Sequence, residues 1–224
     1  MLEIPEFKGF PKIPRLYRQA VWSEKLDGTN AAVGIVEYSF GTWVDGTPGM
    51  MKYVMGNPLP VDHPQYDGLP DKEYLVYAQS RNRLISPADD NHGFARWVWD
   101  NAEKLIELLG PGLHSGEWWG SGIYRGYGLT KGEKRFSLFN TGKWNRAIVR
   151  SEAENTVPWL DVVPVVYQGI FSTEITDALK DTLRTNGSYA APEFMRPEGI
   201  VIYHVAANSY FKTLLEGDDT PKGE

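Results

Sequence analysis

The chain has 224 residues, 42% of them hydrophobic, which is enough to bury the core of one large domain or two small ones. Its 23 basic and 29 acidic residues give a net charge of −6, which argues against a protein that coats long stretches of nucleic acid by neutralising phosphates, although a local basic groove is compatible. The absence of cysteine excludes disulfide scaffolds, zinc ribbons, iron–sulfur clusters and thiol nucleophiles.

A metal ion held by protein side chains would therefore need oxygen or imidazole ligands. The four histidines are too far apart in the sequence to form a zinc signature, so magnesium is the more natural ion. No apolar run approaches the ~20 residues that a membrane helix needs. We therefore expect a cytoplasmic protein that does not contact membranes.

Seven apolar, β-branched runs between turn signals predict short strands at residues 31–38, 74–79, 113–119, 135–139, 162–167, 200–205 and 210–215. Apolar residues at three- and four-residue spacing predict amphipathic helices at 92–109 and 173–184. Residues 40–71 show no clear period, and we interpret them as a surface insertion or a long hairpin. Strands mixed with a few helices indicate an α+β protein, with one domain over residues 1–215 and a tail at 216–224.

The first candidate for chemistry is the segment SEKLDGTN at residues 23–30, directly ahead of a predicted strand. A lysine beside an Asp-Gly turn is by itself usually a solvated surface residue. Other charged groups, however, recur at or within later strands: SRNR at 80–83, GEWWG at 116–120, EGIVI at 198–202 and YFKTL at 210–214. Arginine forks suit phosphate, and a charge within an apolar run needs a partner.

In this order, and together with FSLFN at 136–140, these segments resemble the motifs of the covalent nucleotidyltransferases, the superfamily of ATP-dependent ligases and mRNA capping enzymes. KLDGTN looks like their KxDG motif, and the six matches span Lys25 to Lys212. Thr29 and Asn30, with the short spacing to SRNR, are most similar to RNA ligases that repair broken RNA.

The resemblance implies an ATP-grasp-like adenylation domain, with antiparallel sheets flanked by helices and a nucleotide pocket between two sheets. Only 12 residues follow Lys212, so we expect no C-terminal OB domain of the kind that capping enzymes and DNA ligases carry. A small cytoplasmic or phage-encoded repair enzyme, working as a monomer, is compatible with this size.

The resemblance also implies the reaction. Lys25 would attack the α-phosphate of ATP to form lysyl-AMP, while Lys212 and Mg²⁺ or Mn²⁺ offset charge on the phosphate oxygens. Attack requires a neutral amine, which neighbouring positive charge favours. The AMP would then pass to the 5′-phosphate of an RNA end, and a 3′-hydroxyl would displace it to seal the strand.

The implied nucleotide contacts are Glu24, Asp27, Gly28, Asn30, Arg81, Glu117, Phe139, Glu198 and Lys212. Among them Phe139 would stack on adenine, Glu117 would bind a ribose hydroxyl, and Glu198 would orient a hydrated metal ion, with Glu117 also reaching the metal through water. Arg83 is an alternative to Arg81, because the two would share one face if a strand continued through them.

RNA contact is expected from the densest local group of basic residues, which includes Arg125 in the segment GSGIYRGYG, with Tyr124 and Tyr127 beside it. The predicted RNA-binding residues are Arg83, Arg125, Lys131, Lys134 and Arg135. A solvated loop is the alternative interpretation of this group.

Two positions depart from the family pattern. Members commonly carry two lysines one residue apart in the last motif, whereas this chain has either Lys212 followed by Leu214 or Tyr210 followed by Lys212. Asn140 stands where an acidic residue usually ends FSLFN. These departures keep three alternatives open beside an RNA ligase: a minimal DNA ligase, a GTP-using capping-type enzyme, and a non-catalytic module that binds nucleotide or nucleic acid.

Overall fold

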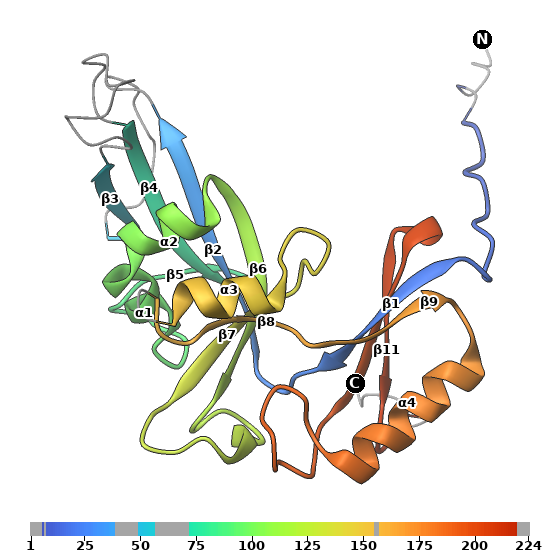
Figure 1. The fold of residues 1–224 in the computed structure, drawn as a ribbon. Coiled ribbons are helices and arrows are strands. Elements are labelled where there is room, and N and C mark those ends of the chain that lie inside the picture. The colour runs from blue at the N-terminus through green and yellow to red at the C-terminus, as the bar shows by residue number, and fades with distance from the viewer. Residues whose placement is uncertain (1–5, 7, 39–48, 57–71, 155–156, 219–224) are drawn as a thin grey trace.

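The computed structural model describes residues 6, 8–38, 49–56, 72–154 and 157–218, and shows an α+β fold built on two sheets (Figure 1). The smaller sheet has the strand order β11-β10-β1-β9, and all its neighbours are antiparallel. Its strands are β1 (Gln19–Lys25), β9 (Val165–Ile170), β10 (Gly199–His204) and β11 (Ser209–Leu214).

The larger sheet has seven strands in the order β3-β4-β2-β6-β7-β8, with β5 paired to β4. Its strands are β2 (Thr29–Tyr38), β3 (Met51–Gly56), β4 (Lys72–Ser80), β5 (Leu84–Ile85), β6 (Gly112–Gly120), β7 (Lys134–Leu138) and β8 (Leu160–Val162). The pairing of β7 with β8 is parallel, so the expectation of purely antiparallel sheets is wrong at this edge.

Helices cover one face of each sheet. The helices α1 (Phe94–Asp100), α2 (Ala102–Leu109) and α3 (Arg146–Ala153) pack on the larger sheet, and α4 (Thr173–Asn186) packs on the smaller one (Figure 1). Two 3-10 turns, η1 (Gly126–Gly128) and η2 (Val205–Ala207), lie in the connections. No helix among the described residues is long and apolar enough to cross a membrane.

Most predicted elements are confirmed, but two are divided. The helix expected at 92–109 is interrupted at Asn101, whose side-chain amide donates to the carbonyl of Trp97 (2.7 Å) and so competes with regular helix bonding. The strand expected at 162–167 is two strands in different sheets, because Pro164 lacks the N–H that a continuous ladder requires.

Four strands and helices were not predicted: β1, β3, β5 and α3. Polar residues hide the alternation of β1, in which Ala20, Trp22 and Glu24 are buried in turn. β3 lies inside the stretch 40–71 and pairs with β4, and the parts of that stretch at 40–48 and 57–71 are outside the described residues.

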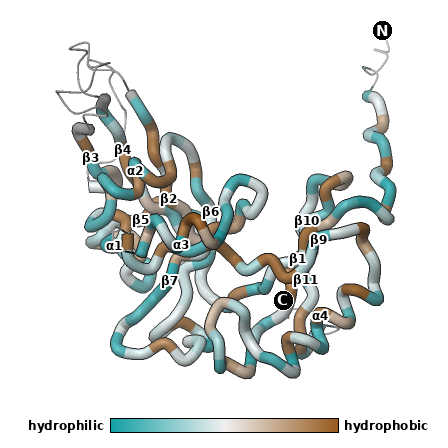
Figure 2. The backbone as a smooth tube through the Cα atoms, in the orientation of Figure 1, coloured by the Kyte–Doolittle hydropathy of each residue, from teal (hydrophilic) through white to brown (hydrophobic). Residues whose placement is uncertain are grey.

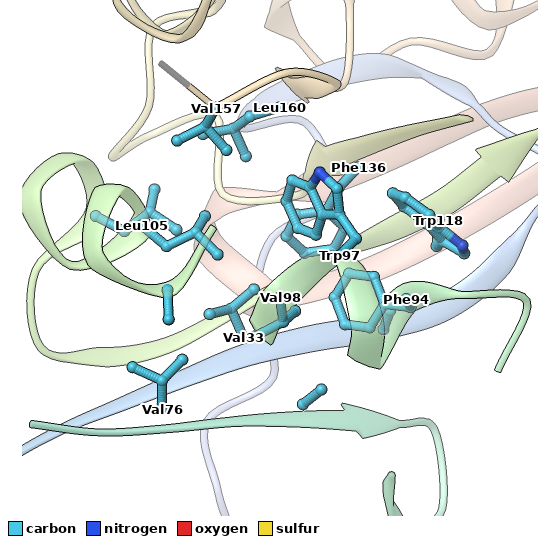
Figure 3. Close-up of a cluster of buried hydrophobic side chains, with 14 of the residues drawn as sticks. Val33, Val76, Phe94, Trp97, Val98, Leu105, Trp118, Phe136, Val157 and Leu160 are labelled. Atoms are coloured by element: carbon cyan, nitrogen blue, oxygen red, sulfur yellow. The ribbon is translucent and has the colours of Figure 1, made fainter. Parts of the chain in front are cut away.

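Three apolar clusters hold the structure together. The largest joins α1, α2 and α3 to the larger sheet, where the rings of Phe94, Trp97, Trp118 and Phe136 meet at centroid distances of 4.9–5.7 Å (Figure 3). A second places Trp22 and Ile202 against Leu183 of α4. A third, which includes Leu26, Trp119 and Tyr127, fills the space where the chain passes from one sheet to the other.

Phe136 tests the larger core, because its side chain is fully buried against the rings of Phe94 and Trp97. Replacing it by Ala leaves a cavity and should lower the free energy of unfolding by about 3–5 kcal/mol. Phe10→Ala is the matched control, since Phe10 is 98% exposed and its loss should change stability little. Urea unfolding measures both, and equal values for the two variants would contradict this packing.

Candidate active site

The predicted nucleotide-binding residues gather around one cleft between the two sheets. Two adjoining cavities of about 300 and 840 Å³ share Lys25, Asn30, Glu117, Val201 and Tyr210 in their walls. The four-stranded sheet contributes β1, β10 and β11 to the cleft, and the seven-stranded sheet contributes β2 and β6. The expected position of the pocket, between two sheets, agrees with the structure.

Lys25 ends β1 and pairs across the sheet with Gly199, the first residue of β10. This register sets Lys25 beside Glu198, and their Nζ and Oε2 atoms lie 2.5 Å apart. The two side chains are 21% and 16% exposed, so the ion pair faces the cleft and is open to a ligand. The structure therefore places a carboxylate directly beside the one lysine of the KxDG segment.

Glu117 lies opposite Asn30 in the pairing of β6 with β2. One carboxylate oxygen accepts the backbone N–H of Gly28 (3.1 Å), and the other accepts the amide of Asn30 (3.4 Å). Burial raises the pKa of Glu117 to about 7, although the positive charge of Lys25 and the Gly28 N–H both act to lower it. The cleft thus holds a carboxyl group that takes up a proton near neutral pH.

Glu24 is a second buried carboxyl group, 1% exposed, at the wall of the smaller cavity. Its Oε2 accepts the backbone N–H of Ala190 (2.9 Å), whereas its Oε1 has no hydrogen-bond partner in the described part of the chain. Burial raises the pKa of Glu24. Phe139 and Val163 line the same cavity, so its wall combines an aromatic ring and an apolar side chain with this buried carboxyl group.

The loop between β6 and β7 stabilises the turn at residues 26–28 through two hydrogen bonds to Asp27. Tyr127 accepts the backbone N–H of Asp27 with its hydroxyl (2.9 Å), and Arg125 donates its Nε–H to the Asp27 carboxylate (3.1 Å). Tyr127 is 2% exposed, so the expectation that it touches substrate from a surface loop is wrong. Tyr124, in contrast, is 77% exposed and lines the larger cavity.

Arg81 and Arg83 separate because β4 ends at Ser80 and the chain turns, with the Ser80 N–H donating to the Arg83 carbonyl (2.9 Å). They therefore do not share the face of a strand, as the sequence suggested. Arg81 lines the larger cavity, while Arg83 forms a two-pronged ion pair with Asp89. Of the two, the structure brings only Arg81 to the cleft.

Lys212 and Tyr210 alternate on β11, and both line the larger cavity. Thr213 points to the other face of the sheet, where its hydroxyl accepts from Nζ of Lys180 on α4 (3.0 Å). Lys180 therefore lies on the face of the sheet opposite the cleft and does not supply a second cation there. The arrangement favours the register in which Tyr210 occupies the place of one family lysine.

Asn140 lines neither of the two cavities. Its side-chain oxygen accepts the backbone N–H of Lys143 (3.0 Å), which stabilises the turn after β7. The loss of the family's acidic residue at this position therefore removes no charge from the cleft walls described here.

The five residues predicted to bind RNA lie outside the cleft walls. Three of them contact acidic side chains of the protein itself: Arg83 pairs with Asp89, Arg125 with Asp27, and Arg135 with Glu133. Lys131 lies at a turn with φ +53°, and Lys134 begins β7. Their contacts with RNA stay predictions.

A divalent cation fits the carboxylates of the cleft. Among the described residues no three His, Asp or Glu side chains form a closed cage. Glu117 and Glu198 nevertheless both line the larger cavity beside Lys25, and Mg²⁺ commonly binds through one or two carboxylates together with substrate phosphates. The donor set therefore suits an ion that arrives with a phosphorylated ligand.

Comparison with known proteins identifies a matching family and solved structures of similar fold. The sequence profile of the RNA ligase family matches residues 18–214. A point mutant of the Naegleria gruberi RNA ligase with AMP and Mn superposes with a TM-score of 0.51 at 15% identity, over 89% of this chain and 50% of that chain. A second mutant of that ligase, with ATP and Mn, gives a TM-score of 0.49 at 15% identity, over 90% and 51%. This chain spans about half the length of these solved proteins, and no curated protein matches it.

The raised pKa of Glu117 makes the stability of the nucleotide-free protein depend on pH. The folded-state pKa is about 7 against an ordinary 4.5, so the folded chain keeps a proton that the unfolded chain releases in this range. Raising the pH from 4.5 to 7 should therefore lower the free energy of unfolding by about 3 kcal/mol through this group.

Glu117→Gln removes the titrating group and should remove this decline. Urea unfolding at several pH values compares it with the wild type, and Glu107→Gln, on the exposed side of α2, controls for the loss of a carboxylate. Curves of wild type and Glu117→Gln that stay parallel from pH 4.5 to 7 would contradict the assignment.

Proposed function

The chain belongs to the RNA ligase family, and we propose that it is an ATP-dependent RNA ligase that adenylates itself on Lys25. The observation that carries the proposal is the convergence of Lys25, Glu117, Glu198, Arg81 and Lys212 on one cleft of sufficient size for a nucleotide. We choose ATP as the nucleotide because of the family and because the Naegleria gruberi ligase was solved with ATP or AMP and Mn. Residues 1–215 form the proposed adenylation domain.

In this proposal the two cavities bind different parts of the nucleotide. The base enters the smaller cavity, where the ring of Phe139 offers a stacking surface and Glu24 a buried polar group. The ribose lies near Glu117 and Asn30, which both cavities share, and the phosphates lie in the larger cavity with Arg81 and Lys212. Cations gather where the phosphates lie, as electrostatic complementarity requires.

The first step needs a neutral Lys25. Glu198 is 2.5 Å away and is the carboxylate in reach of its proton. The freed amine attacks the α-phosphorus, a P–N bond forms, and the bond to the departing pyrophosphate breaks with its electron pair on the leaving oxygen. Held by Glu198 and Glu117, a divalent cation would add positive charge that favours the neutral amine and offsets phosphate charge.

The following steps use the same centre. The oxygen of an RNA 5′-phosphate attacks the lysyl-AMP phosphorus and releases Lys25, and a 3′-hydroxyl then attacks the activated 5′-phosphate, forms the phosphodiester and releases AMP. Lys212 and Arg81 stabilise the negative oxygens in each transfer. Glu198 again lies where it can return or accept the proton of Lys25.

Covalent labelling tests the proposal directly. After incubation with ATP and Mg²⁺, the intact mass should rise by about 329 Da, one AMP joined to the nucleophilic lysine. Lys25→Ala should show no gain, and pyrophosphate treatment beforehand removes AMP already present. No gain with ATP, GTP or NAD would sink the enzymatic proposal in favour of a nucleotide-binding module, and labelling by GTP alone would indicate a capping-type enzyme.

Lys212 provides a second test, with a matched control on the opposite face of the same sheet. Removing a cation that stabilises transition-state charge costs about 10²–10³-fold in rate, so Lys212→Ala should slow adduct formation by that factor. Lys180→Ala should leave the rate near that of the wild type, because Lys180 contacts Thr213 on the far face. Equal slowing of the two variants would mean that the effect is structural.

A further inference from the structure

Residues 8–18, KGFPKIPRLYR, form an arm that precedes β1 and extends away from both sheets (Figure 1). All of them are exposed, including Phe10 at 98% and Ile13 at 92%. Residues 8–15 make no hydrogen bond, ion pair or ring contact with the other described residues. The arm is therefore not part of the packed structure.

The base of the arm is nevertheless fixed. The carbonyl of Leu16 accepts a hydrogen bond from Nε2 of the buried His204 (2.6 Å), and the carbonyl of Arg18 accepts the N–H of Phe171 (2.8 Å). Nδ1 of His204 accepts the N–H of Ala207 (3.1 Å), so the ring proton lies on Nε2 and points at the arm. The arm thus leaves the protein at a defined place, beside the β10–β11 turn.

Charge distinguishes the arm from the rest of the chain. It holds four of the 23 basic residues and none of the 29 acidic ones, so the arm carries +4 and the remainder of the chain −10. The arginines of the body that were expected to bind RNA contact carboxylates of the protein, as Arg83 and Arg135 do. The arm concentrates positive charge without acidic neighbours in its own sequence.

The spacing of the arm sorts its side chains into rows. Pro11 and Pro14 favour an extended polyproline II conformation, in which residues three apart share one side. Lys12 and Arg15 then form a basic row about 9 Å apart, and Phe10 and Ile13 form an apolar row beside it. The chain bends after them, at residues 16–18, where the N–H of Arg18 donates to the carbonyl of Leu16 (2.9 Å). Hydrophilic and hydrophobic residues alternate along this segment (Figure 2).

We propose that residues 8–18 are an arm that binds the substrate RNA away from the break. The basic row contacts phosphates, and Phe10 and Tyr17 offer rings on which unpaired bases stack. A polyanion with flat bases matches both rows, whereas a protein groove for a proline-rich segment matches only the apolar one. The proposal rests on the proposed function, since that function makes RNA the substrate.

The geometry predicts which nucleotides the arm contacts. Six residues of β1 lie between Arg18, at the base of the arm, and Lys25, a distance of about 20 Å at 3.3 Å per residue. At about 3.4 Å between successive phosphates along a helix axis, this corresponds to about six nucleotides. The arm should therefore contact long substrates and miss short ones.

Fluorescence anisotropy of labelled nicked RNA duplexes tests the arm in the full chain. The fourfold variant Lys8→Gln, Lys12→Gln, Arg15→Gln, Arg18→Gln should weaken the salt dependence of binding. The negative slope of log affinity against log salt should decrease in magnitude by about 3, since each phosphate contact contributes about 0.7–0.9 to it. Duplexes with about 16 base pairs on each side of the nick should show this loss, and those with about 4 should not, given the phosphate spacing.

A second fourfold variant controls for net charge, with Gln at four exposed positions of the body: Arg96, Lys104, Arg150 and Arg184. It should leave the slope for long duplexes near the wild-type value. Equal losses in the two variants, an arm effect independent of RNA length, or an unchanged affinity in the arm variant would each overturn the proposal. The last result would point to a protein partner for the arm.

Intact mass separates this proposal from the proposed function. The arm variant should gain AMP on Lys25 as the wild type does, because residues 8–18 lie outside the cleft walls. RNA binding is measured without ATP, so it reports on the arm even where no adduct forms. If the arm variant binds RNA as the wild type does and still gains AMP, the RNA-binding role of the arm is refuted while the proposed function stands.

Discussion

The rest of the site depends on the passage of the chain from one sheet to the other at residues 26–28. β1 ends at Lys25 in the four-stranded sheet, and β2 begins at Thr29 in the seven-stranded one. A side chain at Gly28 would meet the carbonyl oxygen of Trp118 at 2.4 Å and Cβ of Trp119 at 2.7 Å, so only glycine fits this crossing. The tight crossing sets Lys25, the proposed nucleophile, in one sheet beside Asn30 and Glu117 of the other.

Electrostatics inside the cleft follow from that crossing. The Gly28 N–H and the Asn30 amide turn toward Glu117, while the Lys25 ammonium turns toward Glu198. One carboxylate is therefore held by neutral donors in a buried place and the other by a charge at the cleft wall. The first titrates near neutrality and the second neutralises the lysine, and both lie where a phosphorylated ligand and its cation would enter.

An acidic protein with the proposed RNA substrate must concentrate its positive charge. Arg125 stabilises the Asp27 carboxylate under the crossing, and its Nη1 also donates to the carbonyl of Arg196 (2.9 Å). Other arginines outside the arm likewise form ion pairs with carboxylates of the protein and stabilise its loops. In our proposals the cations of the cleft and of residues 8–18 contact the substrate, which would separate the structural from the recognition role of the basic residues.

Local patterns were sufficient for much of the fold. Strands β2, β4, β6, β10 and β11 and helix α4 follow directly from apolar periodicity and turn residues, because those signals lie within each segment. β1 could not be found in this way: its buried positions include Glu24, whose burial depends on Ala190, 166 residues away. Pro164 and Asn101 divided two further elements, and each effect depends on what the neighbouring strands and helices offer.

The sequence by itself indicated the family, since six segments in order from Lys25 to Lys212 resemble the motifs of covalent nucleotidyltransferases, and through that resemblance it suggested the chemistry that we propose. Only the tertiary structure decided which of two arginines faces the cleft, that Tyr127 is a buried support, and that Lys180 lies on the wrong face of its sheet to act. The reason is physical: residue chemistry and periodicity belong to neighbours along the chain, whereas the partner of a side chain is set by the register between strands far apart in sequence.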